Sequence, residues 1–187
     1  MISATIEHRD PYTAGHQQRV RQVCELIGRE LGLSAERVEG LSLAASIHDV
    51  GTSRVPTDIL NKPALLSDIE RRLVQTHANA GADILAGIET PWPLGAIIRQ
   101  HHERLDGSGY PESLAGDEIL LEARILAVAD VLESMANHRP YRAADGVQAA
   151  LAELRAGAAT LYDAEVVAVV ERLVEAGALD LVIAADN

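Results

Sequence analysis

The sequence lacks the features of a secreted, membrane-embedded or nucleic-acid-binding protein. Its single cysteine, Cys24, excludes an internal disulfide and is compatible with a reducing cytoplasm, where we expect the protein to reside. No apolar run approaches the roughly 20 residues that a membrane span needs. The chain has 16 basic and 28 acidic residues, and its net charge of −12 argues against a broad surface for nucleic acid or anionic lipid. Any anionic ligand must therefore be held by a local positive feature.

Alternating strand patterns, internal repeats and low-complexity segments are also lacking. Apolar residues recur instead at steps of three and four, as on one face of a helix, first at Val20, Val23, Cys24, Ile27 and Leu31. Similar patterns cover 36–49, 67–87, 93–103, 120–136, 144–155 and 163–176, and Gly- or Pro-containing turns separate many of them. The sequence predicts an all-α bundle of about seven helices, with Leu179–Ala184 as a possible short strand.

Two further features concern a helix start and the domain organisation of the chain. Ser67 and Glu70 have the spacing of a capping box, which predicts a helix start at this point. The length of 187 residues fits one globular domain with a single core. Helical character begins soon after Met1, so the chain is either a stand-alone domain or a piece of a longer protein in which a sensor or receiver module precedes it.

Seven histidine and aspartate side chains continue the apolar faces of the predicted helices. They are His16, His48, Asp49, His77, His101, His102 and Asp130. One inward histidine is more often a satisfied core residue than a ligand, and a buried carboxylate without compensation costs several kcal/mol. A core has no cheap way to satisfy five imidazoles and two carboxylates, whereas metal ions bind both kinds of group.

The number and type of these donors indicate which metals they would hold. A single zinc ion needs only about three or four protein ligands. Seven ligands suit two ions about 3.5–4 Å apart that share a carboxylate and a water or hydroxide. Mixed imidazole and carboxylate donors favour iron or manganese, without excluding zinc, cobalt or nickel. Two divalent ions would leave a residual positive charge, by which an acidic chain could hold a phosphate.

Five stretches of the sequence resemble, in order, the motifs of the HD-GYP domain. They are RDPYTAGHQQRV, HDVG followed by VPTDILNKP, HANAGADIL, HHERLDGSGYP and ARILAVADVLESMANHRPYR, and together they span about residues 5–145. This family is a bacterial branch of the HD superfamily that hydrolyses cyclic di-guanylate (cyclic di-GMP). The resemblance implies an HD-superfamily helical bundle with a two- or three-metal centre. The helices of 144–176 would complete this bundle.

Carried over position by position, the resemblance implies that the same seven residues are the metal ligands. Asp49 is the expected bridging ligand, which would orient a metal-bridging hydroxide for attack on the phosphodiester. The products would be linear pGpG, GMP or both. No protein nucleophile is needed, and Cys24 lies on an apolar helix face that suits a core position.

The resemblance also implies a set of substrate contacts. Tyr110 closes a glycine-rich loop, with Gly107 and Gly109, that would flank a guanine of the substrate. Arg139 and Arg142 match basic positions that contact phosphate in the family, and a planar guanidinium suits phosphate oxygens. The alternative is that these are two surface arginines closing a turn.

Thr52 departs from the family pattern, because a lysine is usual at this position. In relatives that lysine is thought to reach the substrate phosphate and to pair with an acid that maps to Glu133. A missing charge-assisted bond of this kind costs about 1.5–3 kcal/mol. Arg54 and Lys62 are the candidates to replace it, and Thr52 itself would contact the substrate only through its hydroxyl.

A second departure concerns the number of metals. Three-metal members carry a glutamate one helical turn before the first histidine, where this chain has Tyr12, and Glu7 is out of helical register with that position. We therefore expect two ions rather than three. His8 and His138 match no ligand position and are expected to face solvent.

Three hypotheses for function follow. The first is a phosphodiesterase that hydrolyses cyclic di-GMP. The second is a weak or inactive module that binds cyclic di-GMP or a signalling partner such as a GGDEF-type protein, which Thr52 favours and the complete ligand set opposes. The third is an HD hydrolase of another cyclic dinucleotide. None involves a nucleic-acid polymer or insertion into a membrane.

Overall fold

The computed structural model describes residues 15–137 and 146–183. Two isolated bridges pair Asp106 with Ala115 and Ala158 with Tyr162, but these ranges contain helices and no strand. The prediction of an all-α fold is therefore confirmed. No helix within the described residues has both the length and the apolar character needed to cross a membrane.

Each of the seven predicted helical ranges contains a helix. The elements are α2 (His16–Glu30), α3 (Ala35–Ile47), η2 (Val50–Arg54), α4 (Thr57–Leu60), α5 (Asp68–Gln75), α6 (His77–Ile84), α7 (Leu94–Gln100), η3 (Gly116–Glu118), α8 (Leu121–Ala136), α9 (Val147–Gly157), α10 (Ala164–Glu175) and α11 (Asp180–Ile183). The predicted range 67–87 is divided at Thr76 into α5 and α6. The capping box is present, because the Ser67 side chain accepts from the Glu70 amide and the Glu70 carboxylate accepts from the Ser67 amide.

The possible strand at Leu179–Ala184 is wrong, because Asp180–Ile183 forms the short helix α11. Leu179 is buried and Val182, three residues later, packs against the same core. The amide of Val182 donates to the carbonyl of Leu179 at 3.0 Å. This three-residue spacing directs both side chains inward on a helical turn, whereas on a strand they would face opposite sides.

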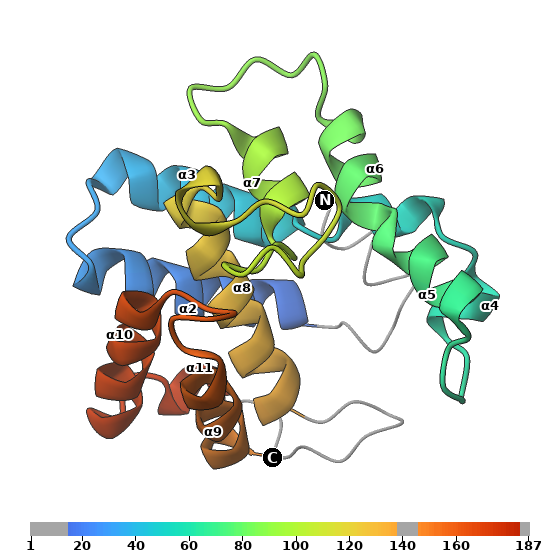
Figure 1. The fold of residues 1–187 in the computed structure, drawn as a ribbon. Coiled ribbons are helices and arrows are strands. Elements are labelled where there is room, and N and C mark those ends of the chain that lie inside the picture. Colours follow the sequence, from blue (N-terminus) through green and yellow to red (C-terminus); the bar gives the residue numbers. More distant parts are fainter. Residues whose placement is uncertain (1–14, 138–145, 184–187) are drawn as a thin grey trace.

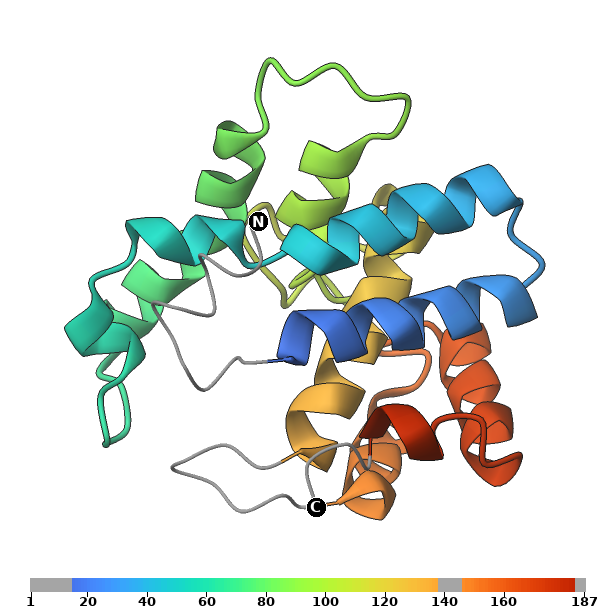
Figure 2. The same cartoon turned by 180° about the vertical axis from the view of Figure 1, so that it is seen from behind.

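Helices α2, α3 and α8 form the centre of the bundle. Figures 1 and 2 show α2 and α3 side by side, with α8 packed across them. Helices α9, α10 and α11 gather on one side of this group, and α4 to α7 lie on the other. The buried core is mainly aliphatic and includes the predicted face of α2, from Val20 to Ile27. Helices α9 and α10 contribute to the same core, as expected if they complete the bundle.

The backbones of η2 and α6 touch at Gly51. A Cβ atom built there would lie 1.9 Å from the carbonyl oxygen of His77 and 2.5 Å from the amide nitrogen of Gly81. Only glycine allows this approach, since both obstructing atoms belong to backbone. Asp49 directly precedes η2 and His77 begins α6. The contact at Gly51 therefore sets the distance between two of the candidate metal ligands.

We predict that Gly51→Ala destabilises the protein by about 3 kcal/mol or more, because the added methyl group must push η2 away from α6. Gly95→Ala is the matched control. A Cβ at Gly95 in α7 would approach no atom closer than 3.8 Å, so this change should be neutral or stabilising by up to about 1 kcal/mol. Urea unfolding of both variants measures the difference, and equal midpoints would contradict the prediction.

Candidate metal centre

The fold brings all seven candidate ligands to one site, mostly from the ends of helices. His16 begins α2, His48 and Asp49 follow α3, His77 begins α6, His101 and His102 follow α7, and Asp130 lies within α8. The imidazole rings form a continuous series in which neighbouring ring centroids are 4.0 to 5.5 Å apart. Four of the five histidines are buried, as their positions on apolar faces predict.

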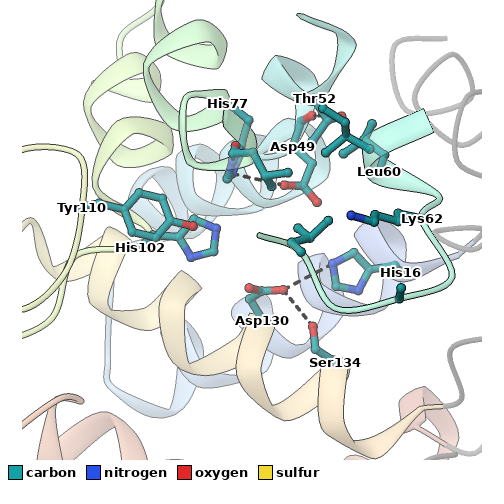
Figure 3. A pocket seen from close by; sticks show the side chains of 14 residues that line it. His16, Asp49, Thr52, Leu60, Lys62, His77, His102, Tyr110, Asp130 and Ser134 are labelled. Atoms are coloured by element: carbon teal, nitrogen blue, oxygen red, sulfur yellow. Dashed lines mark hydrogen bonds and ion pairs between the residues drawn. The ribbon is translucent and has the colours of Figure 1, made fainter. Parts of the chain in front are cut away.

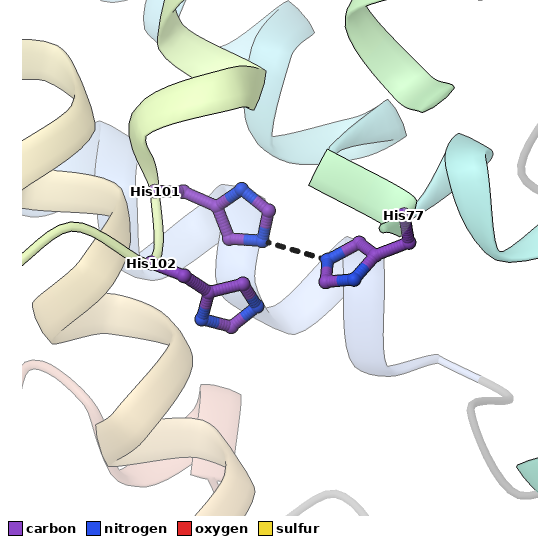
Figure 4. Close-up of side chains that lie close together, drawn as sticks. All are labelled: His77, His101 and His102. Atoms are coloured by element: carbon purple, nitrogen blue, oxygen red, sulfur yellow. Dashed lines mark hydrogen bonds between the residues drawn. The ribbon is translucent and has the colours of Figure 1, made fainter. Parts of the chain in front are cut away.

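Six of the seven residues form two clusters of three donors. His77, His101 and His102 each offer a ligand atom within 4.8 Å of the others (Figure 4). The same holds for His16, His48 and Asp49, of which Figure 3 shows His16 and Asp49. Asp49 belongs to the second cluster and also approaches the first. Its Oδ2 is 3.3 Å from Nε2 of His48, and its Oδ1 is 3.6 Å from Nε2 of His77. One carboxylate therefore presents an oxygen to each cluster, as a bridging ligand does.

Backbone hydrogen bonds orient three of the imidazoles. Each bonds through Nδ1 to a carbonyl three residues earlier in the chain, His48 to Ala45 (2.8 Å), His77 to Val74 (2.8 Å) and His101 to Ile98 (2.5 Å). A carbonyl only accepts, so Nδ1 carries the proton and Nε2 offers its lone pair to the site. The Nε2 atoms of His77 and His101 then face each other at 3.4 Å (Figure 4). Two lone pairs at this distance fit a shared metal ion.

His16 is oriented by Glu133, a buried carboxylate in α8. Nδ1 of His16 hydrogen-bonds to this carboxylate, while Nε2 faces Asp130 at 3.3 Å. Glu133 also accepts from Nε of Arg19 at 2.6 Å and from Nδ2 of Asn137 at 3.0 Å. Carboxylates of this kind fix the tautomer of metal-binding histidines. Glu133 maps to the acid that pairs with the usual lysine in relatives, and in this chain, which has Thr52 instead, its carboxylate contacts His16, Arg19 and Asn137.

The electrostatics of the site favour the metal-binding protonation states of Asp49, His101 and His102. Burial of His48, by contrast, is outweighed by the charge of Asp49, so that the pKa of His48 is raised. Burial alone would raise the pKa of Asp49, but the neighbouring His48 and His77 outweigh it and hold this pKa well below its usual range. Burial lowers the pKa of His102 to about 3, with a contribution from His77, and burial also lowers the pKa of His101. The carboxylate is thus ionised and these imidazoles are neutral, as metal coordination requires.

His16 behaves differently from His101 and His102. Burial lowers its pKa, but the hydrogen bonds to Asp130 and Glu133 outweigh that effect and raise the pKa to about 10. In the absence of ions, a proton on His16 therefore compensates the two carboxylates. A divalent ion at Nε2 would take over this role, so the donor set fits a metal on electrostatic grounds as well as in geometry.

A cavity of about 370 Å³ opens beside the two clusters (Figure 3). Thr52, Lys62, Tyr110 and Ser134 line it together with candidate ligands and aliphatic side chains. The ring of Tyr110 stacks on that of His102, with centroids 4.8 Å apart and planes at 25°. The volume of the cavity is within the range of small-molecule sites. Because candidate ligands line the cavity, a molecule bound in it would lie directly against the donors.

The loop of residues 104–116, which carries Tyr110, is fastened by Glu103. This buried carboxylate accepts from the amide of Glu112 at 2.7 Å and from the amide of Leu114 at 3.1 Å. A Cβ at Gly109 would lie 2.4 Å from the Cα of Glu103, so glycine is required where the loop folds back. The amide of Tyr110 donates to the carbonyl of His102 at 3.3 Å, and the peptide bond between Tyr110 and Pro111 is cis.

The other predicted substrate contacts have different positions. Gly107, with φ of 78°, and Gly109 shape the loop and are not among the residues that line the cavity. Thr52 does line it, but its hydroxyl donates to the carbonyl of Asp49 at 2.7 Å. Arg139 and Arg142 lie outside the described residues, and so do Glu7, His8, Tyr12 and His138.

Sequence reasoning missed Glu103 as a support of the site and did not identify Glu133 as the partner of His16. Glu133 follows Asp130 by three residues in α8, and Arg19 follows His16 by three residues in α2, so each lies on the same helix face as a candidate ligand. That spacing is the signal that could have identified the pair. The role of Glu103 has no comparable signal, because its partners are amides of an irregular loop.

Comparison with known proteins identifies the family. A sequence model of the HD domain matches residues 1–166. The cyclic di-GMP phosphodiesterase response regulator RpfG of Xanthomonas campestris is 41% identical over 87% of this chain and 43% of its own length. The 3'3'-cGAMP-specific phosphodiesterase 3 of Vibrio cholerae is 40% identical over 89% of this chain and 36% of its own length. The chain thus spans less than half the length of these relatives.

Solved structures have the same fold. A cyclic GMP-AMP-specific phosphodiesterase of V. cholerae, V-cGAP3, matches with a TM-score of 0.69 at 24% identity, over 89% of this chain and 45% of that one. Bd1817, an HDG"Y"P protein of Bdellovibrio bacteriovorus, matches with a TM-score of 0.70 at 18% identity, over 86% of this chain and 51% of that one. The chain belongs to the HD-domain family. Within it, the HD-GYP resemblance drawn from the motifs is confirmed.

We predict that Asp49→Ala loses most of the metal bound by the purified protein, because both clusters lose an oxygen donor at once. His48→Ala should also lose metal, since it removes a buried imidazole of one cluster. Asp117→Ala is the matched control, because Asp117 is a fully exposed aspartate outside the site. Metal analysis by plasma mass spectrometry measures the content, and full retention by Asp49→Ala would rule out the bridging position.

We predict that Glu103→Gln exposes the amides of Glu112 and Leu114 to solvent exchange, increasing their rates about tenfold or more. The amide group of glutamine keeps one acceptor oxygen but turns a donor toward the second backbone amide. Glu112→Gln is the control, because the side chain of Glu112 is half exposed and its ion pair with Arg99 is long, at 3.9 Å. Hydrogen exchange measured by NMR checks this, and unchanged protection in Glu103→Gln would show that the loop is fastened by other contacts.

Proposed function

We propose that this chain is a metal-dependent phosphodiesterase that hydrolyses cyclic di-GMP. The observation that carries the proposal is the pair of three-donor clusters joined by Asp49 at the wall of a 370 Å³ cavity. Relatives add support, because RpfG and a Thermotoga maritima protein, 37% identical over 89% of this chain, are both named cyclic di-GMP phosphodiesterases. The matches cover only 43% and 46% of the length of these relatives, so activity and substrate are proposed for this chain.

The seven candidate ligands hold two divalent ions in this proposal, with iron or manganese favoured by the mixed donors. Ions bound there would supply a Lewis acid for phosphoryl oxygens and a hydroxide nucleophile near neutral pH. Asp49 contributes one oxygen to each cluster and so positions the two halves of the centre relative to each other. Glu133 holds His16 with its Nε2 atom toward Asp130. Backbone carbonyls bind Nδ1 of His48, His77 and His101, which leaves the Nε2 atoms of these residues for the site.

Tyr110 is placed to contact the nucleotide. Its ring packs on His102 and lines the cavity, and the loop that carries it is tied to buried Glu103. A rigidly held aromatic side chain at this position suits stacking or edge contact with a purine base. Gly107 and Gly109 act through the shape of the loop. Arg139 and Arg142 remain proposed phosphate contacts on the sequence resemblance alone.

A second candidate substrate is 3'3'-cGAMP. The V. cholerae relative that is 40% identical over 89% of this chain is named as specific for it. Cyclic di-GMP and 3'3'-cGAMP share the phosphodiester ring and differ in one base, so the metal centre suits both. Discrimination between them must come from contacts to the bases. The proposed partners, a GGDEF-type protein or a preceding sensor or receiver module, and the cytoplasmic location remain predictions from the sequence.

We predict that protein loaded anaerobically with iron(II) or manganese(II) hydrolyses cyclic di-GMP, and that Asp49→Ala abolishes the reaction. Parallel assays with 3'3'-cGAMP, resolved by chromatography, give the ratio of kcat/KM for the two substrates and show whether the reaction stops at the linear dinucleotide. Binding without turnover by fully metallated protein would favour the hypothesis of a signalling module. Absence of both binding and turnover would refute the proposed function.

A further inference from the structure

Among the described residues that line the cavity, Lys62 is the one lysine or arginine. It lies in the segment between α4 and α5 that forms one rim of the cavity. Figure 3 shows its side chain extending from this rim toward the side where Asp49 and His16 lie. The same cavity contains the carboxylates of Asp49 and Asp130. The ammonium group of Lys62 is a local positive feature of the kind that an acidic chain needs to hold an anion.

Thr52 cannot supply that charge, and its hydroxyl proton is already used in a hydrogen bond to the backbone. Its Oγ1 donates at 2.7 Å to the carbonyl of Asp49, within its own turn. Arg54, the other candidate to replace the usual lysine, is not among the residues lining the cavity. It is more than half exposed and lies 3.8 Å from Asp83. Of the two cations near this turn, only Lys62 lines the cavity.

Glu70 fixes the position of the Lys62 ammonium. Nζ donates to both oxygens of this carboxylate, at 2.8 and 2.7 Å. Glu70 is itself held by the amide and hydroxyl of Ser67 in the capping box of α5, at 2.7 and 2.8 Å. Hydrogen bonds from Lys62 and Ser67 lower the pKa of Glu70 to about 2, so this anchor stays ionised at neutral pH.

The geometry leaves the ammonium with capacity for a ligand. An ammonium group has three protons, and the contact with Glu70 uses two of them. The third is available to an acceptor in the cavity. An anchored lysine has also lost part of its rotamer freedom before a ligand arrives, so less entropy is lost when it makes a further contact.

We propose that Lys62 binds a phosphate oxygen of the cyclic dinucleotide and supplies the positive charge that Thr52 lacks. This inference rests on the proposed function, because the ligand is the substrate proposed above. Lys62 is thus a binding residue rather than a metal ligand. It would stabilise the phosphate to the same extent in the bound substrate and in the transition state. Its loss should therefore raise KM and Kd more than it lowers kcat.

The test compares Lys62→Met, which keeps most of the aliphatic stem, with Lys62→Arg, which keeps the charge. Arg54→Met is the matched control, because it removes a cation that does not line the cavity. Calorimetry with a phosphorothioate analogue of cyclic di-GMP gives Kd for metal-loaded protein, and steady-state assays give KM and kcat. We expect Lys62→Met to raise Kd and KM about 10- to 100-fold, while Lys62→Arg retains most of the affinity and Arg54→Met is unchanged.

A rescue variant separates binding from a structural effect of losing the contact with Glu70. Thr52→Lys in the Lys62→Met background should restore affinity, although it does not restore the bond to Glu70. The difference in Kd between wild type and Lys62→Met should also shrink as sodium chloride is raised, because salt screens the charge. Metal content and thermal midpoint are measured for every variant, so that a loss of ions or of folding is recognised.

The outcomes distinguish this inference from the proposed function. If wild type binds or hydrolyses the nucleotide and Lys62→Met behaves like Arg54→Met, the role of Lys62 is overturned and the proposed function stands. If metal-loaded wild type neither binds the analogue nor hydrolyses cyclic di-GMP or 3'3'-cGAMP, the proposed function falls, and the role of Lys62 falls with it. Weaker binding by Lys62→Met, restored by Thr52→Lys, supports both.

Discussion

Polar donors inside an aliphatic bundle must each find a partner, and this requirement shapes the whole of the metal centre. Nδ1 of four imidazoles is occupied by a carbonyl or a carboxylate, which directs Nε2 inward. The inward atoms then have mostly one another as neighbours, including two Nε2 atoms 3.4 Å apart. Protein groups alone satisfy such an arrangement poorly. Cations bound there would satisfy it, so the geometry of the bundle and the occupancy of the site would depend on each other.

The supports of the site differ in how far they extend along the chain. The carbonyl partners of His48, His77 and His101 are three residues away, so local helix geometry is sufficient to place them. His16 depends on Glu133, which is 117 positions away and reaches it through the packing of α2 against α8. A change that shifts these two helices would therefore disturb His16 before it disturbs the other imidazoles.

Periodicity was sufficient to predict the helices and the seven inward donors, because both follow from which face of a helix is apolar. The break at Thr76 was not predictable in this way. No glycine or proline marks it, and Thr76 itself has helical dihedral angles, with φ of −64° and ψ of −14°. The possible strand at Leu179–Ala184 was wrong for a related reason, since a short segment of apolar residues fits a strand and a helical turn equally well.

The supporting residues could not be derived from the sequence with the same certainty. Glu103 resembles an ordinary surface acid until the loop folds over it, and its two amide partners follow it by 9 and 11 positions. Lys62 was one of two candidates to replace the usual lysine, and only the three-dimensional arrangement separates it from Arg54. In each case the decisive contact depends on an irregular segment, for which residue spacing carries little information.

The chain contains one cysteine, buried and unpaired in α2, so no covalent cross-link ties its helices together. The candidate metal centre contains side chains from α2, from α8 and from the junctions next to α3, α6 and α7. Ions bound there would act as a reversible cross-link between these helices. Chelation would then loosen the bundle as reduction loosens a disulfide-linked domain. The supply of metal in the cell would set how long the folded protein persists, in addition to whether it is active.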